Sequence, residues 1–185
     1  ASEVGHVALD TETNSLDAMQ ADFVGISLAV APGRACYIPL QHRAGDGLFD
    51  SGLLEGQIPL DQALAELKPL LADPGVLKIG QNLKYDIAVF NRHGVEVAPF
   101  DDTMLISYAL DAGNGGQGMD RLSELHLGHK PIAYAEVAGT GKSQVTFDKV
   151  PLDKATAYAA EDGDVRLRLW LALKPRLVPG RKSTV

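Results

Sequence analysis

Apolar residues follow a strand-like spacing early in the chain and a helix-like spacing later. The first third contains short apolar runs separated by polar breaks, and these runs predict strands at 4–10, 23–30 and 34–40. Because the breaks are short, an antiparallel meander is the simplest arrangement of these strands. A Gly-rich surface loop is expected at 44–56.

The remainder of the chain alternates between helix and strand signals. Leucines recur at helical spacing up to Asp73, and the apolar run VLKIG follows soon after. Helices are predicted at 60–71, 82–93, 119–126 and 151–173, and a further helix is predicted to begin at 102–103. A strand is predicted at 76–80 and an extended piece at 97–100. The stretch 113–118 is expected to be a loop, and 131–147 to be irregular. Either Asp102 or Thr103 could cap the helix that begins there.

The size and composition of the chain favour one domain spanning residues 1–185. With 45% hydrophobic residues, the chain can bury one sizeable core. No apolar stretch approaches the roughly 20 residues of a membrane span, so no membrane partner is expected. The single Cys36 lies in an apolar run, which predicts a buried thiol and no disulfide. The start at Ala1 and the polar end PGRKSTV suggest a domain excised from a longer chain.

Two carboxylates stand two residues apart at the end of the first predicted strand. Residues i and i+2 of a strand project from the same face, so Asp10 and Glu12 should converge. The alternative is that DTET is only a solvated turn.

A third carboxylate lies on a buried stripe of the last predicted helix. Tyr158, Asp162, Val165 and Leu169 share one face at spacings of four, three and four. The other two acids of EDGD, Glu161 and Asp164, lie on other faces of the helix and should be solvated. A carboxylate on an apolar stripe needs a cation or strong donors nearby, and a bound metal ion would satisfy Asp162.

Asp86 in GQNLKYD is a fourth candidate. It lies one turn after Asn82, on a helix that begins at the carboxyl edge of the sheet. The alternative is an exposed carboxylate paired with Lys84 or Arg92. Four carboxylates from three elements suit hard cations, and two such ions about 4 Å apart can clamp a phosphoryl displacement.

The motifs DTETNSL, GQNLKYD and YAAEDGDV, in this order, resemble the three motifs of the 3′-5′ proofreading exonuclease domains of bacterial family A polymerases (DNA polymerase I). These domains form the tyrosine branch of the DEDD exonuclease superfamily. The similarity runs from about 7 to 173. It implies a ribonuclease H-like α/β fold with a mixed five-stranded sheet flanked by helices, a cytoplasmic, nucleoid-associated bacterial location, and a polymerase domain in the same longer chain.

The resemblance also implies a reaction and its ligands. The expected activity is hydrolysis of the 3′-terminal phosphodiester of single-stranded or frayed DNA, releasing nucleoside 5′-monophosphates. Asp10, Glu12 and Asp162 would hold one divalent ion, and Asp10 would reach a second ion that Asp86 supports through water. The two ions would be Mg²⁺ or Mn²⁺, and Zn²⁺ could occupy one site. Tyr158 would orient the attacking water.

Residues expected to contact the substrate also follow from the resemblance. Leu16 and Tyr134 would wedge and stack against the terminal bases, and stacking suits any sequence because every base has a π-face. The sugar and phosphate contacts would come from Gln81, Asn82 and Tyr85.

Two alternative functions stay open at this point. A ribonuclease D-like RNA-trimming exonuclease would share the same three motifs, because DNA is distinguished from RNA by contacts to the 2′ position. A catalytically silent scaffold or nucleic-acid-binding domain would not need the four acids. The net charge of −7 argues against tight duplex binding but allows an enzyme that grips a few nucleotides.

Overall fold

In the part of the chain that the computed structural model describes (residues 1–44, 52–111 and 116–177), five strands form one mixed sheet. The strands are β1 (His6–Thr13), β2 (Phe23–Ala31), β3 (Arg34–Pro39), β4 (Leu77–Gly80) and β5 (Phe100–Asp102), in the spatial order β3-β2-β1-β4-β5. The first three pair antiparallel, whereas β4 runs parallel to β1 and β5 parallel to β4. The predicted meander and mixed sheet are confirmed.

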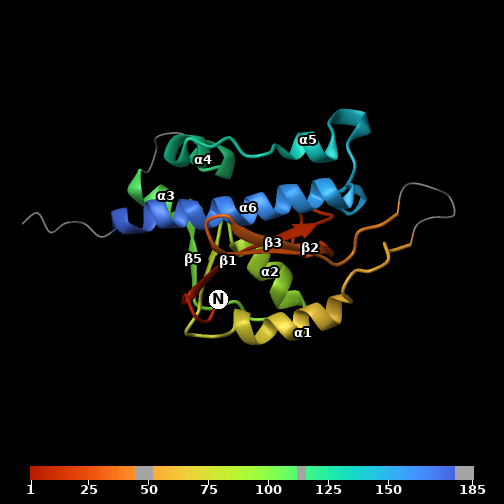
Figure 1. Ribbon diagram of the computed structural model, residues 1–185, viewed down its shortest axis with the longest axis horizontal. Helices are drawn as coiled ribbons and strands as arrows, with labels where there is room; N and C mark the ends of the chain where they lie inside the picture. The colour runs from red at the N-terminus through yellow and green to blue at the C-terminus, as the bar shows by residue number, and fades with distance from the viewer. Residues whose placement is uncertain (45–51, 112–115, 178–185) are drawn as a thin grey trace, which may run out of the picture.

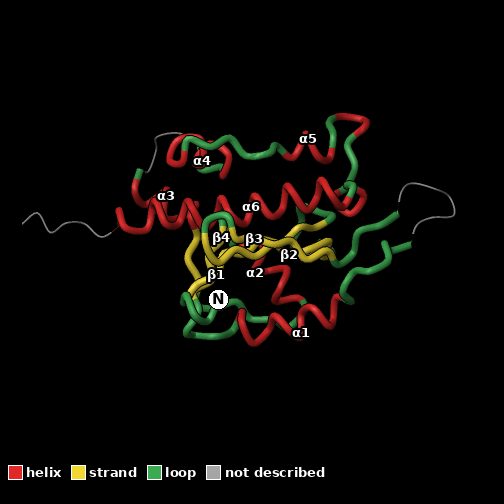
Figure 2. Tube along the Cα trace, in the orientation of Figure 1, coloured by secondary structure: helices red, strands yellow, loops and turns green. Residues whose placement is uncertain are grey.

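Helices cover both faces of this sheet (Figure 1). One face carries α1 (Leu60–Leu71) and α2 (Lys84–Arg92), and the other is crossed by α6 (Leu152–Leu173). The helices α3 (Thr103–Leu110), α4 (Met119–Leu127) and α5 (Tyr134–Ala138) lie outside or beside α6. Figure 2 shows that extended loops join α4, α5 and α6. Single 3-10 turns occur at Gly141–Ser143, Phe147–Lys149 and Lys174–Leu177.

The two faces of the sheet are packed differently. Large side chains such as Leu9, Phe23 and Phe90 fill the core under α1 and α2. Small residues at four-residue spacing, Ala155 and Ala159 among them, face the sheet from α6 and are fully buried. Because these residues lack bulk, the helix backbone can lie close to the strands. The close packing of α6 on β2 and β3 brings its polar residues within reach of β1.

Several sequence-based expectations need correction. β1 continues to Thr13, so the first two carboxylates lie inside the strand and not at its end. A short helix, α5, forms within the stretch expected to be irregular. Cys36 is exposed and not buried, because β3 is an edge strand whose alternate side chains face outward. Of the two residues that could cap α3, Asp102 does so, because its side chain accepts hydrogen bonds from the backbone N–H groups of Met104 and Leu105.

Three predicted segments lie partly or wholly outside the described residues. These are the loops expected at 44–56 and 113–118 and the tail PGRKSTV. Among the described helices, none is long and apolar enough to cross a membrane.

Candidate active site

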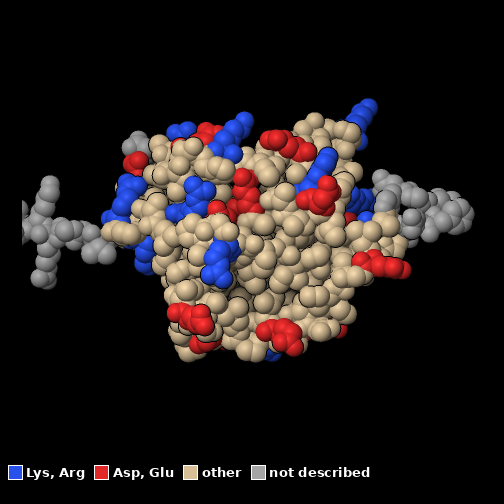
Figure 3. Space-filling model, viewed as in Figure 1, with Lys and Arg blue, Asp and Glu red and all other residues tan. Residues whose placement is uncertain are grey.

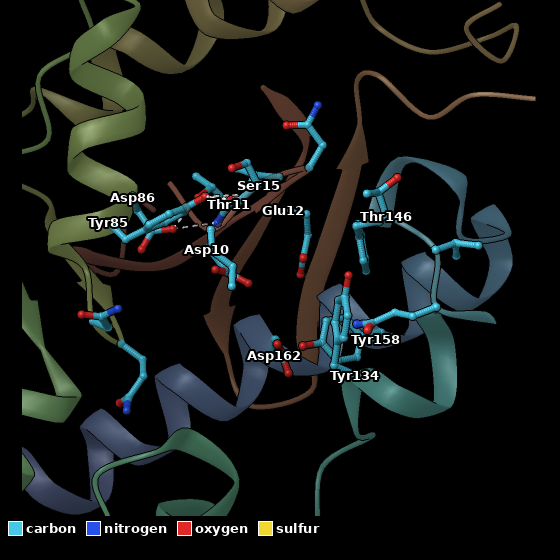
Figure 4. Close-up of a pocket in the computed structure, with 18 of the residues that line it drawn as sticks. Asp10, Thr11, Glu12, Ser15, Tyr85, Asp86, Tyr134, Thr146, Tyr158 and Asp162 are labelled. Carbon is cyan, nitrogen blue, oxygen red and sulfur yellow. Dashed lines mark hydrogen bonds between the residues drawn. The ribbon is translucent and has the colours of Figure 1, made fainter. Parts of the chain in front are cut away.

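A cleft of about 660 Å³ opens between β1, the start of α2, and the segment from α5 to α6. Figure 4 shows side chains from these elements pointing into it. The volume falls within the roughly 300–1,000 Å³ that is typical of ligand sites. All ten residues predicted to act in catalysis or binding line this cleft: Asp10, Glu12, Leu16, Gln81, Asn82, Tyr85, Asp86, Tyr134, Tyr158 and Asp162.

Strand alternation along β1 sends neighbouring residues to different partners. Asp10 and Glu12 are buried and point toward α6, whereas Thr11 between them reaches α2. The backbone N–H and the hydroxyl of Thr11 donate to Asp86 Oδ1 at 2.9 and 2.6 Å. Asp86 is therefore held against β1, and the alternative of an exposed carboxylate paired with Lys84 or Arg92 is wrong, because Asp86 is 3% exposed.

The third carboxylate comes from α6, as its position on the buried stripe predicted. Asp162 is 4% exposed. The next residue, Gly163, packs on β2, where an added Cβ would lie 3.2 Å from Ser27 Oγ. Ser27 pairs directly with Asp10 in the sheet. The glycine therefore permits the close approach that brings Asp162 to Asp10.

Asp10, Glu12 and Asp162 each offer one oxygen, and these three oxygens lie within 4.8 Å of one another. Glu12 Oε1 is buried and has no hydrogen-bond partner. Burial raises the pKa of Asp10, and burial with the charges of Asp10 and Asp162 raises that of Glu12 well above its ordinary value. Burial, then the charge of Asp10, raises the pKa of Asp162 to about 7. A divalent cation would relieve this repulsion and satisfy the orphaned oxygen.

Asp86 stands slightly apart from that cluster. It is not among the three residues whose oxygens converge, and Thr11 satisfies its Oδ1. Burial, followed by the charge of Asp10, raises the pKa of Asp86 to about 7. This geometry fits a supporting carboxylate better than a direct member of the cluster.

Sequence reasoning missed Arg166, which also lines the cleft. Its Nη1 donates to Asp10 Oδ1 at 2.6 Å and to the Leu9 carbonyl at 3.2 Å. Burial acts to lower the pKa of Arg166, but the surrounding carboxylates, Asp10 foremost, raise it above its ordinary value. The sequence does contain a signal for Arg166, because Tyr158, Asp162 and Arg166 follow one another at four-residue spacing and so lie along one side of the helix.

Tyr158 lies one turn before Asp162, beside the cluster (Figure 4). Burial, then the charges of Asp162, Glu12 and Asp10, raise the pKa of its phenol. The hydroxyl is therefore protonated at neutral pH. Its ring packs against Phe147 and Tyr134, with centroids 5.7 and 6.0 Å away. Such packing fixes the ring while its hydroxyl faces the carboxylates.

Two apolar side chains are displayed at the mouth of the cleft. Leu16 is 99% exposed and Tyr134 is 37% exposed. The Tyr134 ring stacks on Phe147 at 6.2 Å, with 22° between the ring planes. The turn that carries Leu16 is anchored by Tyr85, whose hydroxyl lies 2.6 Å from Thr13 Oγ1 and donates to the Ser15 carbonyl at 2.5 Å.

The turn between β4 and α2 supplies the remaining predicted contacts. Asn82 is exposed and has φ of 56°, a conformation that asparagine tolerates better than most residues. Asp102 fixes this turn by accepting from the backbone N–H groups of Asn82 and Leu83 at 3.1 and 2.8 Å. Gln81 is buried, and its amide donates to the Gln117 carbonyl at 2.7 Å.

The other two acids of EDGD, expected to be solvated, are engaged in the fold. Glu161 accepts from the backbone N–H of Ile132 at 2.6 Å and lies 2.9 Å from His129 Nε2. This fastens the segment that leads to Tyr134 onto α6. Asp164 accepts from the backbone N–H of Gly33 at 2.6 Å and so ties α6 to the β2–β3 turn.

The surface charge is mixed on the face that Figure 3 shows. Lys and Arg side chains there are separated by neutral and acidic groups and do not merge into a continuous basic stripe. Together with the net charge of −7, this arrangement suits contacts to a few nucleotides better than a long duplex interface.

Residues 1–178 match the sequence profile of a family described as 3′-5′ exonuclease in type A DNA polymerases. DNA polymerase I from Rhizobium leguminosarum is 57% identical over 195 residues, an alignment that covers 100% of this chain and 19% of that protein. DNA polymerase I from Pseudomonas aeruginosa is 45% identical and covers 92% of this chain and 18% of its own length. The chain thus spans about a fifth of these curated relatives.

The fold is shared with solved nuclease structures. Brucella melitensis NrnC with bound Mg²⁺ superposes with a TM-score of 0.68 at 20% identity, covering 95% of this chain and 75% of that one. At this level of sequence identity, the structural similarity shows that the two chains share a fold. The predicted ribonuclease H-like fold is confirmed.

Proposed function

Because the chain belongs to the 3′-5′ exonuclease domain family of type A DNA polymerases, we propose that it trims the 3′ end of single-stranded or frayed DNA. The terminal phosphodiester is hydrolysed with two divalent ions and a nucleoside 5′-monophosphate is released. In a polymerase chain this reaction serves proofreading. The observation that carries the proposal is the convergence of Asp10, Glu12 and Asp162, with one oxygen of Glu12 buried and unpartnered.

The carboxylate set suits Mg²⁺ or Mn²⁺, because its donors are all hard oxygens. Asp10, Glu12 and Asp162 would hold one ion, and Asp10 with Asp86 would serve the second. When bound, these ions supply the positive charge that activates the attacking water and stabilises the leaving oxygen. Zn²⁺ could occupy the three-carboxylate position.

Tyr158 orients the attacking water and does not deprotonate it. Its phenol is protonated because burial and the neighbouring carboxylates raise its pKa. A protonated hydroxyl can donate one hydrogen bond and accept another, which fixes the direction of a water lone pair. Packing against Phe147 limits the motion of the ring.

The mouth of the cleft grips the strand end. Leu16 inserts beside the terminal bases, and Tyr134 offers a π-face, as expected for sequence-independent single-strand binding. Asn82 and Tyr85 also line the cleft, and Tyr85 lies beside the turn that carries Leu16, where the sugar and phosphate would lie. Gln81 acts mainly by stabilising this part of the cleft. Its side-chain amide donates to the Gln117 carbonyl, and its Oε1 accepts from the Thr103 hydroxyl.

DNA is the proposed substrate because the two relatives described above are both DNA polymerase I. The polymerase domain of the same longer chain is then the natural partner, and the bacterial cytoplasm, near the nucleoid, is the place of action. RNA trimming shares the active-site logic but has no observation of its own in favour. A silent scaffold has no need of four buried carboxylates, and all four are present.

The test is digestion of a 5′-labelled single-stranded DNA and the RNA of the same sequence. Wild type is compared with Asp10→Ala and Asp162→Ala in Mg²⁺, in Mn²⁺ and in chelator. Stepwise shortening of DNA from the 3′ end, lost in chelator and in both variants, is expected. Faster shortening of RNA would assign the chain to RNA trimming, and metal-independent activity would contradict the mechanism.

A further inference from the structure

The cleft that should hold a strand of phosphates offers that strand very little positive charge. Among the described residues that line the cleft, Arg166 is the one cation, and its Nη1 is already engaged by Asp10 Oδ1 at 2.6 Å. Proteins that bind nucleic acid usually draw much of their affinity from lysine and arginine contacts to phosphates. Phosphates that lie beyond the carboxylate cluster therefore need neutral hydrogen-bond donors.

The segment 139–146, between α5 and α6, forms one edge of the cleft and lines it with Gln144 and Thr146. Figure 4 shows Thr146 on the side of Tyr158, across the carboxylates from Asp86. Val145 packs in the same apolar cluster as Tyr158. The segment is therefore anchored on the wall that also carries the proposed base contact.

Hydrogen bonds within this segment hold it as a closed loop. The backbone N–H of Val145 donates to the Ala138 carbonyl at 2.9 Å and so joins the two ends of the loop. The backbone N–H and the hydroxyl of Ser143 both donate to the Thr140 carbonyl, at 3.3 and 2.9 Å. The position of the next residue, Gln144, is thus set by a backbone that is bonded on both sides of it.

Gln144 carries a donor that the fold leaves unused. Its side chain is exposed and makes no hydrogen bond within the part of the chain that the structure describes. Gln81, the other glutamine that lines the cleft, is engaged at both ends, by the Gln117 carbonyl and the Thr103 hydroxyl. A primary amide offers two N–H donors and one acceptor. The amide of Gln144 is therefore available to a ligand in the cleft.

We propose that Gln144 is a further substrate-binding residue, whose side-chain amide donates to a nonbridging phosphate oxygen of the strand, at a linkage 5′ to the scissile bond. A base that lies on Tyr134 leads its strand along this loop, because the Tyr134 ring stacks on Phe147 at the end of the same segment. Hydrogen bonds to a charged acceptor such as phosphate are stronger than those between neutral groups. The inference rests on the proposed exonuclease function and adds a phosphate contact to it.

Opposite charges placed at position 144 test this contact, with KM and kcat measured on 5′-labelled single-stranded DNA in saturating Mg²⁺. Gln144→Glu keeps the size of the side chain but replaces the donor with an anion. KM should rise about 10- to 100-fold while kcat stays close to that of wild type, because only binding is lost. Gln144→Lys should bind at least as tightly as wild type. Its added ionic contact should steepen the plot of log KM against log salt concentration by about 0.7.

Gln62→Glu and Gln62→Lys are the matched controls, because they make the same two changes of net charge. Gln62 is exposed on α1, which covers the face of the sheet opposite α6. Both variants should leave KM and its salt dependence unchanged. If they shift KM as much as the variants at position 144, the effect is one of overall charge and the inference is wrong. An unchanged KM in Gln144→Glu contradicts it equally.

DNA strands with one neutral methylphosphonate linkage, placed at successive positions 5′ to the scissile bond, identify the phosphate. At the contacted linkage the methylphosphonate should remove most of the difference in KM between Gln144→Glu and wild type, whatever the base sequence. A difference that follows base identity and is relieved at no linkage would mean that Gln144 contacts a base, which overturns the inference.

The same measurements separate this inference from the proposed function. Wild type that digests DNA while Gln144→Glu matches it leaves the exonuclease in place and removes the phosphate contact. Wild type that neither binds nor digests the strand removes both. If wild type binds the strand without cutting it, the exonuclease is contradicted, and the same variants are compared by Kd from fluorescence anisotropy, where an unchanged Kd in Gln144→Glu removes the contact as well.

Discussion

The two walls of the cleft differ in solvent exposure: one, the carboxylate wall, carries Asp10, Glu12, Asp86 and Asp162, and the other, the substrate wall, carries Leu16 and Tyr134. The carboxylate wall is buried, with Asp10 5% and Asp162 4% exposed, whereas Leu16 on the substrate wall is 99% exposed. Buried charges interact strongly with ions and with the reacting phosphate, while exposed apolar groups gain free energy only when a base covers them. The first wall should therefore control the rate of the chemical step, and the second should control affinity for the strand.

Within the carboxylate wall, the largest loss should come from a residue inside the three-oxygen cluster. Glu12→Gln keeps the shape but removes an anionic oxygen donor, and kcat should fall by about 10³-fold through loss of transition-state charge stabilisation. Asp86→Asn should cost clearly less, because Asp86 lies outside the cluster. Single-turnover rates on labelled DNA measure both. A larger loss in Asp86→Asn would reverse the assigned roles.

Removing one hydroxyl from the buried wall should slow the reaction without disturbing ion binding. Tyr158→Phe should lower kcat by about 10²-fold, since only the orientation of water is lost. Mn²⁺ affinity, measured by calorimetry, should equal that of wild type. A matched loss of Mn²⁺ affinity would mean that the phenol supports the ions instead. Tyr37→Phe, another buried tyrosine in the same apolar cluster, tests whether any lost hydroxyl has this effect.

On the substrate wall, truncation should change KM more than kcat. Leu16→Ala and Tyr134→Ala should each raise KM for single-stranded DNA about 5- to 150-fold, the range expected for ~1–3 kcal/mol per stacked base. At saturating DNA the rate should remain close to that of wild type. Tyr134→Phe retains the π-face and should behave like wild type. Unchanged KM in both alanine variants would remove the base-contact role.

The smallest effect concerns stability of the metal-free protein. Burial raises the pKa of Asp86 and Asp162 to about 7 from the ordinary value of 3.8. Between about pH 4 and 7 the folded state therefore binds more protons at these two groups than the unfolded state does, so their contribution to stability falls as pH rises through this window. Melting temperature in chelator should fall by several degrees over this window. Asp162→Asn should flatten the trend, whereas Asp164→Asn should not.

Magnesium provides the complementary measurement. Divalent ions bind ionised carboxylates, so added Mg²⁺ should raise the melting temperature more at pH 8 than at pH 5. An equal rise at both pH values would contradict ion binding at these carboxyl groups.

Local pattern was sufficient for most of the helices and strands and for the acidic residues that line the candidate active site. Alternation along β1 placed Asp10 and Glu12 on one face, and helical spacing placed Asp162 inward, because these periodicities follow from backbone geometry alone. The family resemblance implied the mixed five-stranded sheet that the structure contains. The proposed reaction came from the family resemblance, because residue spacing alone indicates no reaction.

Contacts between distant parts of the chain decided the rest. Thr11 donates hydrogen bonds to Asp86, which is 75 residues away in the sequence. Arg166 donates to the Leu9 carbonyl, at a sequence separation of 157 residues. Cys36 lies in an apolar run but is exposed, because β3 is an edge strand. The position of β3 at the edge follows from the order of strands in the sheet, which local sequence does not indicate. Sequence periodicity fixes the direction of a side chain relative to its own element. The partner that it meets, and hence its charge balance and solvent exposure, depends on how the elements pack together.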